Sequence, residues 1–459
     1  MDMFEEKDIY TEYPKETKPS KKKIVTLVVV FVLVLALVAG VAFFGGAMYA
    51  QSGTVESEMP MVKTVIDALN RYYIDEIDWE QFQFIVASAV ANSIDPYTGL
   101  VAATPTGMKT ASIGVTFGWN DYCNYYITEI SPGSPAAKAK NVFSDGSYGS
   151  QQLKVGDEIY SINGQVVQHL NSSSFSQLLS VAGDTLDLRV LRHAADGSVS
   201  AMYQFKIDKE MFHAPVAYYL DTETTGLPSD VGYIRLNEFG DTAPEDFYNS
   251  VQEFLADEDK PNKLVLDLRG NGGGDTMMCG YIASFFVKQN GTSDGIPMAK
   301  YVYNSGGGDM AETYFYTQTS YVSDLDGKTY GSVNLYDEVD DFECVILVNG
   351  SSASSSELLT ATLSHYCGIK SVGSKTYGKG VAQIVLTYNN QKYEMYITNG
   401  KYYIPTDKNG NTVFETNIHG VGLTPDIAVE ASGIYYMELD PCLTAAAEYF
   451  TSADVDAVA

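Results

Sequence analysis

The pattern of apolar and polar positions changes abruptly near the start of this 459-residue chain. Residues 1–23 are polar, and residues 24–50 then run without one charged side chain. About 20 apolar residues cross a bilayer, whereas a secretory signal has a shorter apolar core. We therefore predict a transmembrane anchor at residues 24–50, with cleavage as a signal peptide as the alternative. The three lysines at 21–23 predict a cytoplasmic N-terminal tail and an extracellular location for everything after Gln51.

Residues 57–105 show apolar side chains at helical spacing. The first set is Val62, Val65, Ile66 and Leu69, and the second is Phe82, Ile85, Val86 and Ala89. The Asp95-Pro96 pair ends the second helix. We expect a helical N-terminal arm that packs or forms a homodimer.

Residues 108–210 change to short alternating segments that predict a small β domain. Strands are expected at 112–117, 125–130 and 185–191, with a helix at 174–181 and glycine-containing turns between them. This order resembles a PDZ domain, in which an extended C-terminus adds a strand beside a backbone loop that holds its carboxylate. The resemblance implies peptide binding at Ile113, Gly114 and Val115. The alternative is a small β domain of another kind.

Residues 215–432 alternate strands and helices and predict an α/β core. Strands are expected at 232–236, 264–268 and 344–348, and helices at 244–255 and 357–366. Residues 290–341 are rich in Gly, Tyr and Asp without a clear period, and we expect a surface excursion or lid there. The tail, 433–459, contains a short predicted helix at 441–449 and a loose acidic end.

Composition excludes several classes of protein. An apolar content of 45% is incompatible with global disorder. The formal charge is −29, and because six acids cancel six lysines within residues 1–23, the whole excess lies beyond them. Such a surface argues against nucleic acid and against anionic lipid as partners. The five cysteines and five histidines have no metal-ligand spacing, so neither a metal nor a cofactor is predicted.

The most informative pair of residues is Ser354 and Lys379, which lie 25 positions apart. A serine hydroxyl needs a base to become a nucleophile, and a lysine amine can serve only when burial lowers its pKa from about 10.4. Ser354 follows an apolar strand and opens a helix, whose N–H groups favour negative charge. The N–H of Ser355 is then directed at a developing oxyanion. A second donor is available in the glycines at 272–274.

At these motifs the chain resembles the carboxyl-terminal processing proteases, the S41 serine peptidases. The matching segments are Ser352-Ala-Ser354-Ser-Ser-Glu357, Gly378-Lys379-Gly380, Asp267-Leu-Arg-Gly-Asn-Gly-Gly273-Gly274 and Gly422-Leu-Thr-Pro425-Asp426. The resemblance covers residues 57–430 and implies a ClpP/crotonase-like α/β protease core. It also implies that Ser354 is the nucleophile, Lys379 the base and Gln383 their support, with Gly273 and Ser355 forming the oxyanion hole.

The resemblance implies a serine endopeptidase that cleaves proteins with accessible C-termini. His365 stands where some members carry an acidic residue, so a supporting role for that position is doubtful. Arg269 and Asp267 are expected to hold the glycine turn rather than act on substrate. One alternative is a non-catalytic PDZ scaffold that retains a protease fold. An acidic adhesion protein is a further alternative, although the sequence has no repeat or wall-anchoring signal.

Overall fold

The computed structural model describes most of the chain after residue 59. The described residues are 60–72, 77–102, 111–119, 124–181, 183–194, 197–288, 295–306, 308–323, 327–388, 392–430 and 440–458. The predicted cytoplasmic tail, 1–23, and anchor, 24–50, lie outside them. Within these ranges no helix is both long and apolar enough to span a membrane. The chain divides into two units, residues 1–104 with 383–398 and residues 105–382 with 399–459.

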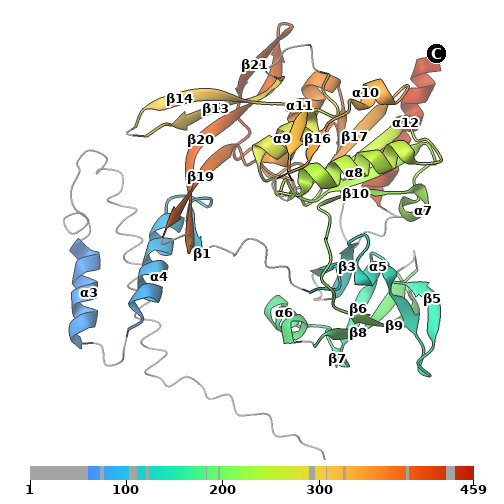
Figure 1. The fold of residues 1–459 in the computed structure, drawn as a ribbon, viewed down its shortest axis with the longest axis horizontal. Helices are drawn as coiled ribbons and strands as arrows, with labels where there is room; N and C mark the ends of the chain where they lie inside the picture. Colours follow the sequence, from blue (N-terminus) through green and yellow to red (C-terminus); the bar gives the residue numbers. More distant parts are fainter. Residues whose placement is uncertain are drawn as a thin grey trace, which may run out of the picture. The chain divides into compact units, whose positions relative to one another are not determined.

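The larger unit contains a six-stranded sheet in the order β10–β11–β12–β17–β18–β22. Figure 1 labels β10 and β17 of this sheet. Its strands are β10 (Ala217–Leu220), β11 (Val231–Leu236), β12 (Lys263–Asp267), β17 (Glu343–Val348), β18 (Lys370–Gly373) and β22 (Ile427–Ala428). β10 is antiparallel to β11, and the remaining pairs are parallel. Parallel neighbours require crossover connections, which are usually helices. The mixed α/β content predicted for residues 215–432 is confirmed.

Helices cover both faces of this sheet because successive strand side chains point to opposite sides. The helices are α7 (Thr222–Thr225), α8 (Ala243–Ala256), α9 (Thr276–Ala283), α10 (Leu335–Glu338), α11 (Ser355–Cys367) and α12 (Pro441–Val458). On one face Leu264 and Leu266 of β12 share a core with residues of α8, α9 and α11. On the other face Val265 shares a core with Phe450 of α12. The catalytic candidates arise where β12 and β17 end.

A second sheet is formed by residues of the predicted PDZ-like domain, in the order β2–β3–β6–β8–β9–β4–β5, with β7 on β6. The elements are β2 (Val115–Trp119), β3 (Tyr125–Ile130), α5 (Pro135–Lys138), β4 (Lys140–Val142), β5 (Tyr148–Gln152), β6 (Glu158–Ile162), β7 (Gln165–Val166), α6 (Ser172–Val181), β8 (Thr185–His193) and β9 (Val199–Asp208). Its core contains Ile127, Ile159, Leu188 and Phe205, all fully buried. Among the described strands, β2 ends this order and pairs with β3.

Residues 290–341, which were expected to be a surface excursion or lid, contain regular strands in the described part. They contain β13 (Pro297–Asn304), β14 (Met310–Tyr316), β15 (Ser320–Val322) and β16 (Thr329–Gly331). β13 pairs with β14 and with residues 400–403 of β20 (Tyr393–Lys408), which also pairs with β21 (Asn411–Thr416). The aromatic side chains on both faces of β13 and β14 are only partly buried, so the sequence lacks a clean apolar–polar alternation.

The smaller unit holds the predicted helical arm together with residues 383–398. Its elements are α3 (Pro60–Tyr72), α4 (Trp79–Asn92), β1 (Gly99–Ala102), most of β19 (Val381–Tyr388) and the first part of β20. β1 is antiparallel to β20, with Gly99 opposite Tyr396. Asp95 accepts hydrogen bonds from the backbone of Tyr97 and Thr98, which ends the arm in a tight turn, as the Asp-Pro pair predicted.

The C-terminal tail also differs from its prediction. α12 runs from Pro441 to Val458, well past the expected end at residue 449. Cys442, Leu443, Ala446 and Phe450 are buried against the sheet. A proline at the first helical position and apolar residues at helical spacing explain its start and packing. Acidic residues after position 449 made the sequence resemble a loose tail, so the second half of α12 was not predicted.

Candidate active site

Ser354 occupies a strained turn between β17 and α11. Its φ is 56° and its ψ is −118°, and its side chain is half-buried. A positive φ in a residue with a side chain costs on the order of 1–3 kcal/mol and persists only where neighbouring contacts impose it. A sharp strand-to-helix turn of this kind presents the serine hydroxyl of a nucleophile elbow. The sequence-predicted position of Ser354 at a helix start is therefore found, with a backbone suited to a nucleophile.

The carboxylate of Glu357, which is fully buried, connects the serine turn to the lysine turn. Its Oε2 accepts hydrogen bonds from the backbone N–H of Ser354 and of Lys379, both at 2.9 Å. Its Oε1 accepts from the hydroxyl of Thr376 at 2.6 Å and the N–H of Gly378 at 2.7 Å. The backbone nitrogens of Ser354 and Lys379 are therefore close together, because both donate to the same carboxylate oxygen at 2.9 Å. One acid fixes both segments together.

Lys379 lies on a tightly packed turn between two glycines. A Cβ on Gly378 would lie 2.7 Å from the backbone nitrogen of Gly422, and one on Gly380 would lie 2.6 Å from that of His419. Gly378 also has a φ of 91°. Burial lowers the pKa of Lys379, because desolvation disfavours the charged amine. This is the direction that a lysine base requires.

Tyr402 on β20 forms a second connection between the two turns. Its hydroxyl donates to the backbone carbonyl of Lys379 and lies 3.3 Å from that of Ser354. In addition, the N–H of Tyr377 donates to the carbonyl of Ser352 at 3.0 Å. Three independent contacts thus hold the lysine segment against the serine segment.

The glycine turn after β12 packs directly on the serine turn. Asn271, fully buried, accepts at its backbone carbonyl from the N–H of Ala353 at 3.0 Å and the hydroxyl of Ser356 at 2.9 Å. Gly273 has a φ of 103°, and a Cβ there would lie 2.7 Å from the Cβ of Ser354. Only glycine therefore fits this position without displacement of Ser354.

The backbone N–H groups of Gly273 and Ser355, the two predicted oxyanion donors, differ in their hydrogen bonds. The N–H of Gly273 donates to Oδ1 of Asn271 at 2.9 Å. Ser355 is the first residue of α11, where backbone N–H groups have no partner within the helix. Its hydroxyl donates to the carbonyl of Gly274 at 2.7 Å, which ties the helix start to the glycine turn.

Comparisons with known proteins identify a family and relatives for this chain. Residues 230–429 match the family model for Peptidase family S41. This match supports the S41 family for the segment that it covers. It is 29% identical over 303 residues to the carboxyl-terminal-processing peptidase 1 of Arabidopsis thaliana chloroplasts, covering 65% of this chain and 54% of that protein. These matches support the predicted family and a serine-type peptidase.

Two further similarities extend over more of the chain. A carboxy-terminal-processing protease of Bartonella bacilliformis is 25% identical over 414 residues, covering 86% of this chain and 82% of that protein. A solved putative S41 protease from Bacteroides fragilis is 17% identical, with a TM-score of 0.55, over 88% of this chain and 98% of its own. At that identity the structural likeness supports the fold alone.

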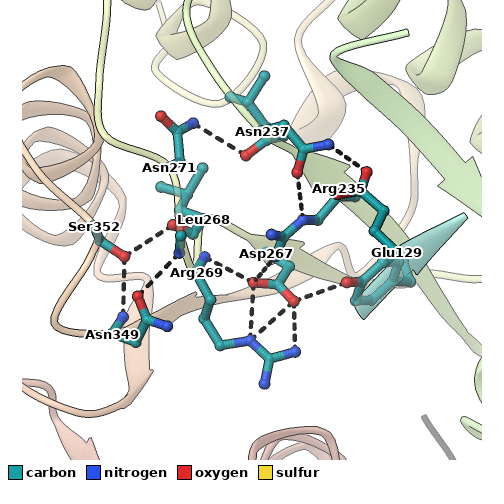
Figure 2. A network of polar contacts seen from close by, with 12 residues as sticks. Glu129, Arg235, Asn237, Asp267, Leu268, Arg269, Asn271, Asn349 and Ser352 are labelled. Atoms are coloured by element: carbon teal, nitrogen blue, oxygen red, sulfur yellow. Dashed lines mark hydrogen bonds and ion pairs between the residues drawn. The ribbon is translucent and has the colours of Figure 1, made fainter. Parts of the chain in front are cut away.

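Beneath the glycine turn lies a buried ion network around Asp267 (Figure 2). Asp267 contacts the guanidinium groups of Arg235 at 2.9 Å and Arg269 at 2.6 Å. Burial raises the pKa of Asp267, but the two guanidinium charges outweigh it and lower that pKa to about 2. Asn237 and Glu129 extend the network to β3, as Figure 2 shows. The expected structural role of Asp267 and Arg269 at this turn fits these contacts.

The remaining predicted residues make other contacts. Gln383 begins the segment assigned to the smaller unit, where its amide donates to the carbonyl of Tyr97 at 3.2 Å. His365 on α11 lies 2.9 Å from the hydroxyl of Thr412, and burial lowers its pKa. The contact of the His365 ring with Thr412 does not involve Ser354.

The predicted peptide-binding residues precede and begin β2. Ile113 is buried, and the N–H of Gly114 donates to the hydroxyl of Ser112 at 3.2 Å. A Cβ on Gly114 would lie 2.3 Å from the Cβ of Ser134, so the loop requires glycine here. Val115 is the first residue of β2.

Sequence reasoning missed how Glu357, Asn271 and Tyr402 assemble the site. Glu357 stands three residues after Ser354, which is the spacing of a capping box and could have indicated its contact with the serine N–H. Asn271 and Tyr402 have no comparable local signal, because their partners are distant along the chain. In the described residues no group of acidic, histidine or cysteine side chains forms a metal site.

Proposed function

We propose that this chain is a serine endopeptidase in which Ser354 is the nucleophile and Lys379 the general base. The observation that carries the proposal is the Glu357 carboxylate, which binds the backbone N–H of both residues. The strained Ser354 backbone and the lowered pKa of Lys379 add to it. Neither histidine nor metal is needed for this chemistry.

Neutral Lys379 removes the Ser354 proton as the oxygen attacks the carbonyl carbon of a peptide bond. The resulting oxyanion accepts hydrogen bonds from the N–H groups of Ser355 and Gly273. Because the Gly273 N–H is bonded to Asn271, this second role requires the glycine peptide to turn toward the substrate. Protonated Lys379 donates to the leaving amine, and water, deprotonated by Lys379, releases the acyl group and restores the serine. Gln383 holds the lysine amine in line.

Residues 108–210 form a PDZ-like domain that captures substrate C-termini. β2 stands at the end of its sheet order and so offers a strand edge for an added peptide strand. Phe117 of β2 contacts Phe175 of α6 at 5.4 Å between ring centroids, which brings a helix beside that strand. Ile113, Gly114 and Val115 receive the peptide end.

The chain is anchored in the cell membrane through residues 24–50, with its N-terminus cytoplasmic and its catalytic domain extracellular. The uncharged run of 27 residues after three lysines supports this orientation. The amphipathic face of α3 supports a homodimer through the helical arm, because Val62, Val65, Ile66 and Leu69 share one side of that helix.

A Ser354→Ala variant separates the peptidase from a non-catalytic PDZ scaffold. The variant removes the attacking oxygen, so cleavage of an unfolded protein such as β-casein is expected to disappear. Binding of a fluorescent peptide with a free C-terminus is expected to remain at the wild-type level, whereas a C-terminally amidated peptide should bind weakly to both proteins. Cleavage by Ser354→Ala at the wild-type rate would exclude the serine mechanism. Wild-type protein that binds but never cleaves would favour the scaffold.

A further inference from the structure

Asp440 lies outside both the predicted site and residues 230–429, which match the family model. It immediately precedes α12, and its side chain is 1% exposed. A buried carboxylate is costly unless it is paired and hydrogen-bonded. The groups that bind Asp440 therefore explain how its charge is tolerated in the interior.

The partner of Asp440 is the arginine of the glycine turn. Oδ2 of Asp440 lies 2.6 Å from Nη1 of Arg269, and its Oδ1 accepts the N–H of Cys442 at 2.8 Å. The carboxylate thus caps α12 and binds Arg269 at once. α12 cannot move freely, because Leu443 and Phe450 are buried against the sheet.

Arg269 uses the rest of its guanidinium on Asp267. Its Nε lies 3.0 Å from Asp267 Oδ1, and its Nη2 lies 2.6 Å from Oδ2. The planar guanidinium fork has fixed directions, so Asp267 and Asp440 together determine the orientation of Arg269. Asp440 thus supplies a second carboxylate to a nearly buried cation.

From Arg269 the contacts continue directly to the serine turn. The carbonyl of Leu268, the preceding residue, accepts the hydroxyl of Ser352 at 2.8 Å. The carbonyl of Asn271 accepts from Ala353, and Gly273 packs on the Cβ of Ser354. A shift of Arg269 would therefore be transmitted to the residues that position the nucleophile and the oxyanion donors.

We propose that Asp440 is a positioning residue for hydrolysis, which acts through Arg269 on the glycine turn and brings the C-terminal helix into the catalytic machinery. This inference rests on the proposed serine mechanism. Asp440 approaches neither Ser354 nor substrate in this account, so its loss should lower kcat while KM stays near the wild-type value. A misplacement of about 1 Å in such a site can cost up to about a hundredfold in rate.

The test compares kcat and KM of Asp440→Asn, Asp440→Glu and Glu448→Gln in the full chain, with a fluorogenic peptide well below each unfolding temperature. We expect Asp440→Asn to lose roughly tenfold or more in kcat, since its amide would place a donor against Arg269. Asp440→Glu restores the charge and should recover part of that loss. Glu448 is exposed on the same helix, so Glu448→Gln controls for removal of an acid from α12.

A double-variant comparison tests the route through Arg269. If Asp440 acts through that residue, Asp440→Asn combined with Arg269→Gln should be no slower than Arg269→Gln alone. Multiplied losses would overturn the proposal, as would folded Asp440→Asn with wild-type kcat. If Asp440→Asn does not fold, Asp440→Glu decides: a loss confined to kcat supports the proposal, and an unchanged kcat overturns it.

The outcome of Ser354→Ala separates this inference from the mechanism on which it rests. When Ser354→Ala is inactive and Asp440→Asn matches wild type, only the role of Asp440 fails. When Ser354→Ala retains wild-type cleavage, the serine mechanism fails, and the role of Asp440 fails with it.

Discussion

Ser354 and Lys379 differ from Gln383 in the part of the molecule that holds them. The two proposed reacting residues lie in the larger unit, where Glu357 and Tyr402 contact both segments. Gln383 opens the segment that belongs to the smaller unit, where it donates to Tyr97. The proposed nucleophile and base therefore belong to one unit, and the proposed supporting residue belongs to the other. Variants of the shared contacts should be more harmful than variants of Gln383.

The largest effect of this kind is expected for Glu357→Gln. The carboxylate accepts four hydrogen bonds, and an amide would turn its NH₂ group toward two of those donors. Each unsatisfied buried donor costs about 1–3 kcal/mol, so both turns should loosen. We expect roughly a hundredfold loss of kcat in a peptide assay, together with a lower free energy of unfolding in a urea titration.

Glu253→Gln on α8 is the matched control, because Glu253 is exposed. It should behave like wild type in both measurements. Wild-type activity in Glu357→Gln would remove the central contact of this comparison.

Gly273→Ala should have the next largest effect. Its Cβ would lie 2.7 Å from the Cβ of Ser354, on a backbone with a φ of 103°. Conformational strain of this kind costs on the order of 1–3 kcal/mol, and any relaxation displaces the nucleophile. We expect kcat to fall by about tenfold or more, since a displaced nucleophile is not aligned for attack.

Gly272→Ala provides a close control one residue away. A Cβ there meets no atom within 4 Å, and the residue has no strained positive φ. Peptidase activity near the wild-type level is therefore expected. Equal losses in the two alanine variants would show that the turn is sensitive to any substitution rather than to contact with Ser354.

The smallest effect in this series is expected for Gln383→Ala. Loss of the proposed hydrogen bond from Gln383 to the lysine amine would correspond to about 1 kcal/mol, or roughly a fivefold fall in kcat/KM. Gln383→Glu keeps the shape and is expected to raise the lysine pKa through its negative charge, so its pH–rate profile should move to higher pH. A profile identical to that of wild type would place Gln383 outside the site.

How much of this site the sequence predicts depends on the range of its contacts. The strand, the turn and the helix around Ser354 are local, and their order along the chain indicates them. Burial of the lysine segment was also indicated by its flanking glycines. The bond from Asn271 to Ser356 joins residues 85 positions apart, and the pair of Arg269 with Asp440 arises only when α12 covers the sheet. No periodicity in the sequence encodes such pairings.

The same distinction explains why the strands within residues 290–341 were not predicted. Tyr301 and Tyr303 lie on one side of β13, and their rings stack at 4.9 Å in a strand that is only half-buried. Such strands are stabilised by cross-strand pairs rather than by a fully apolar face. Their partners in β14 and β20 cannot be read from a local pattern.

The central claim is that uncharged Lys379 activates Ser354, and the pH dependence of kcat/KM tests it most directly. Burial lowers the pKa of Lys379 from its usual value of about 10.4, and the neutral amine predominates above that lowered pKa. Activity should therefore rise with pH through one ionisation whose midpoint lies below 10.4. Lys379→Arg should be inactive at every pH, because guanidinium stays charged. A flat profile, or cleavage by folded Lys379→Arg, would contradict the account.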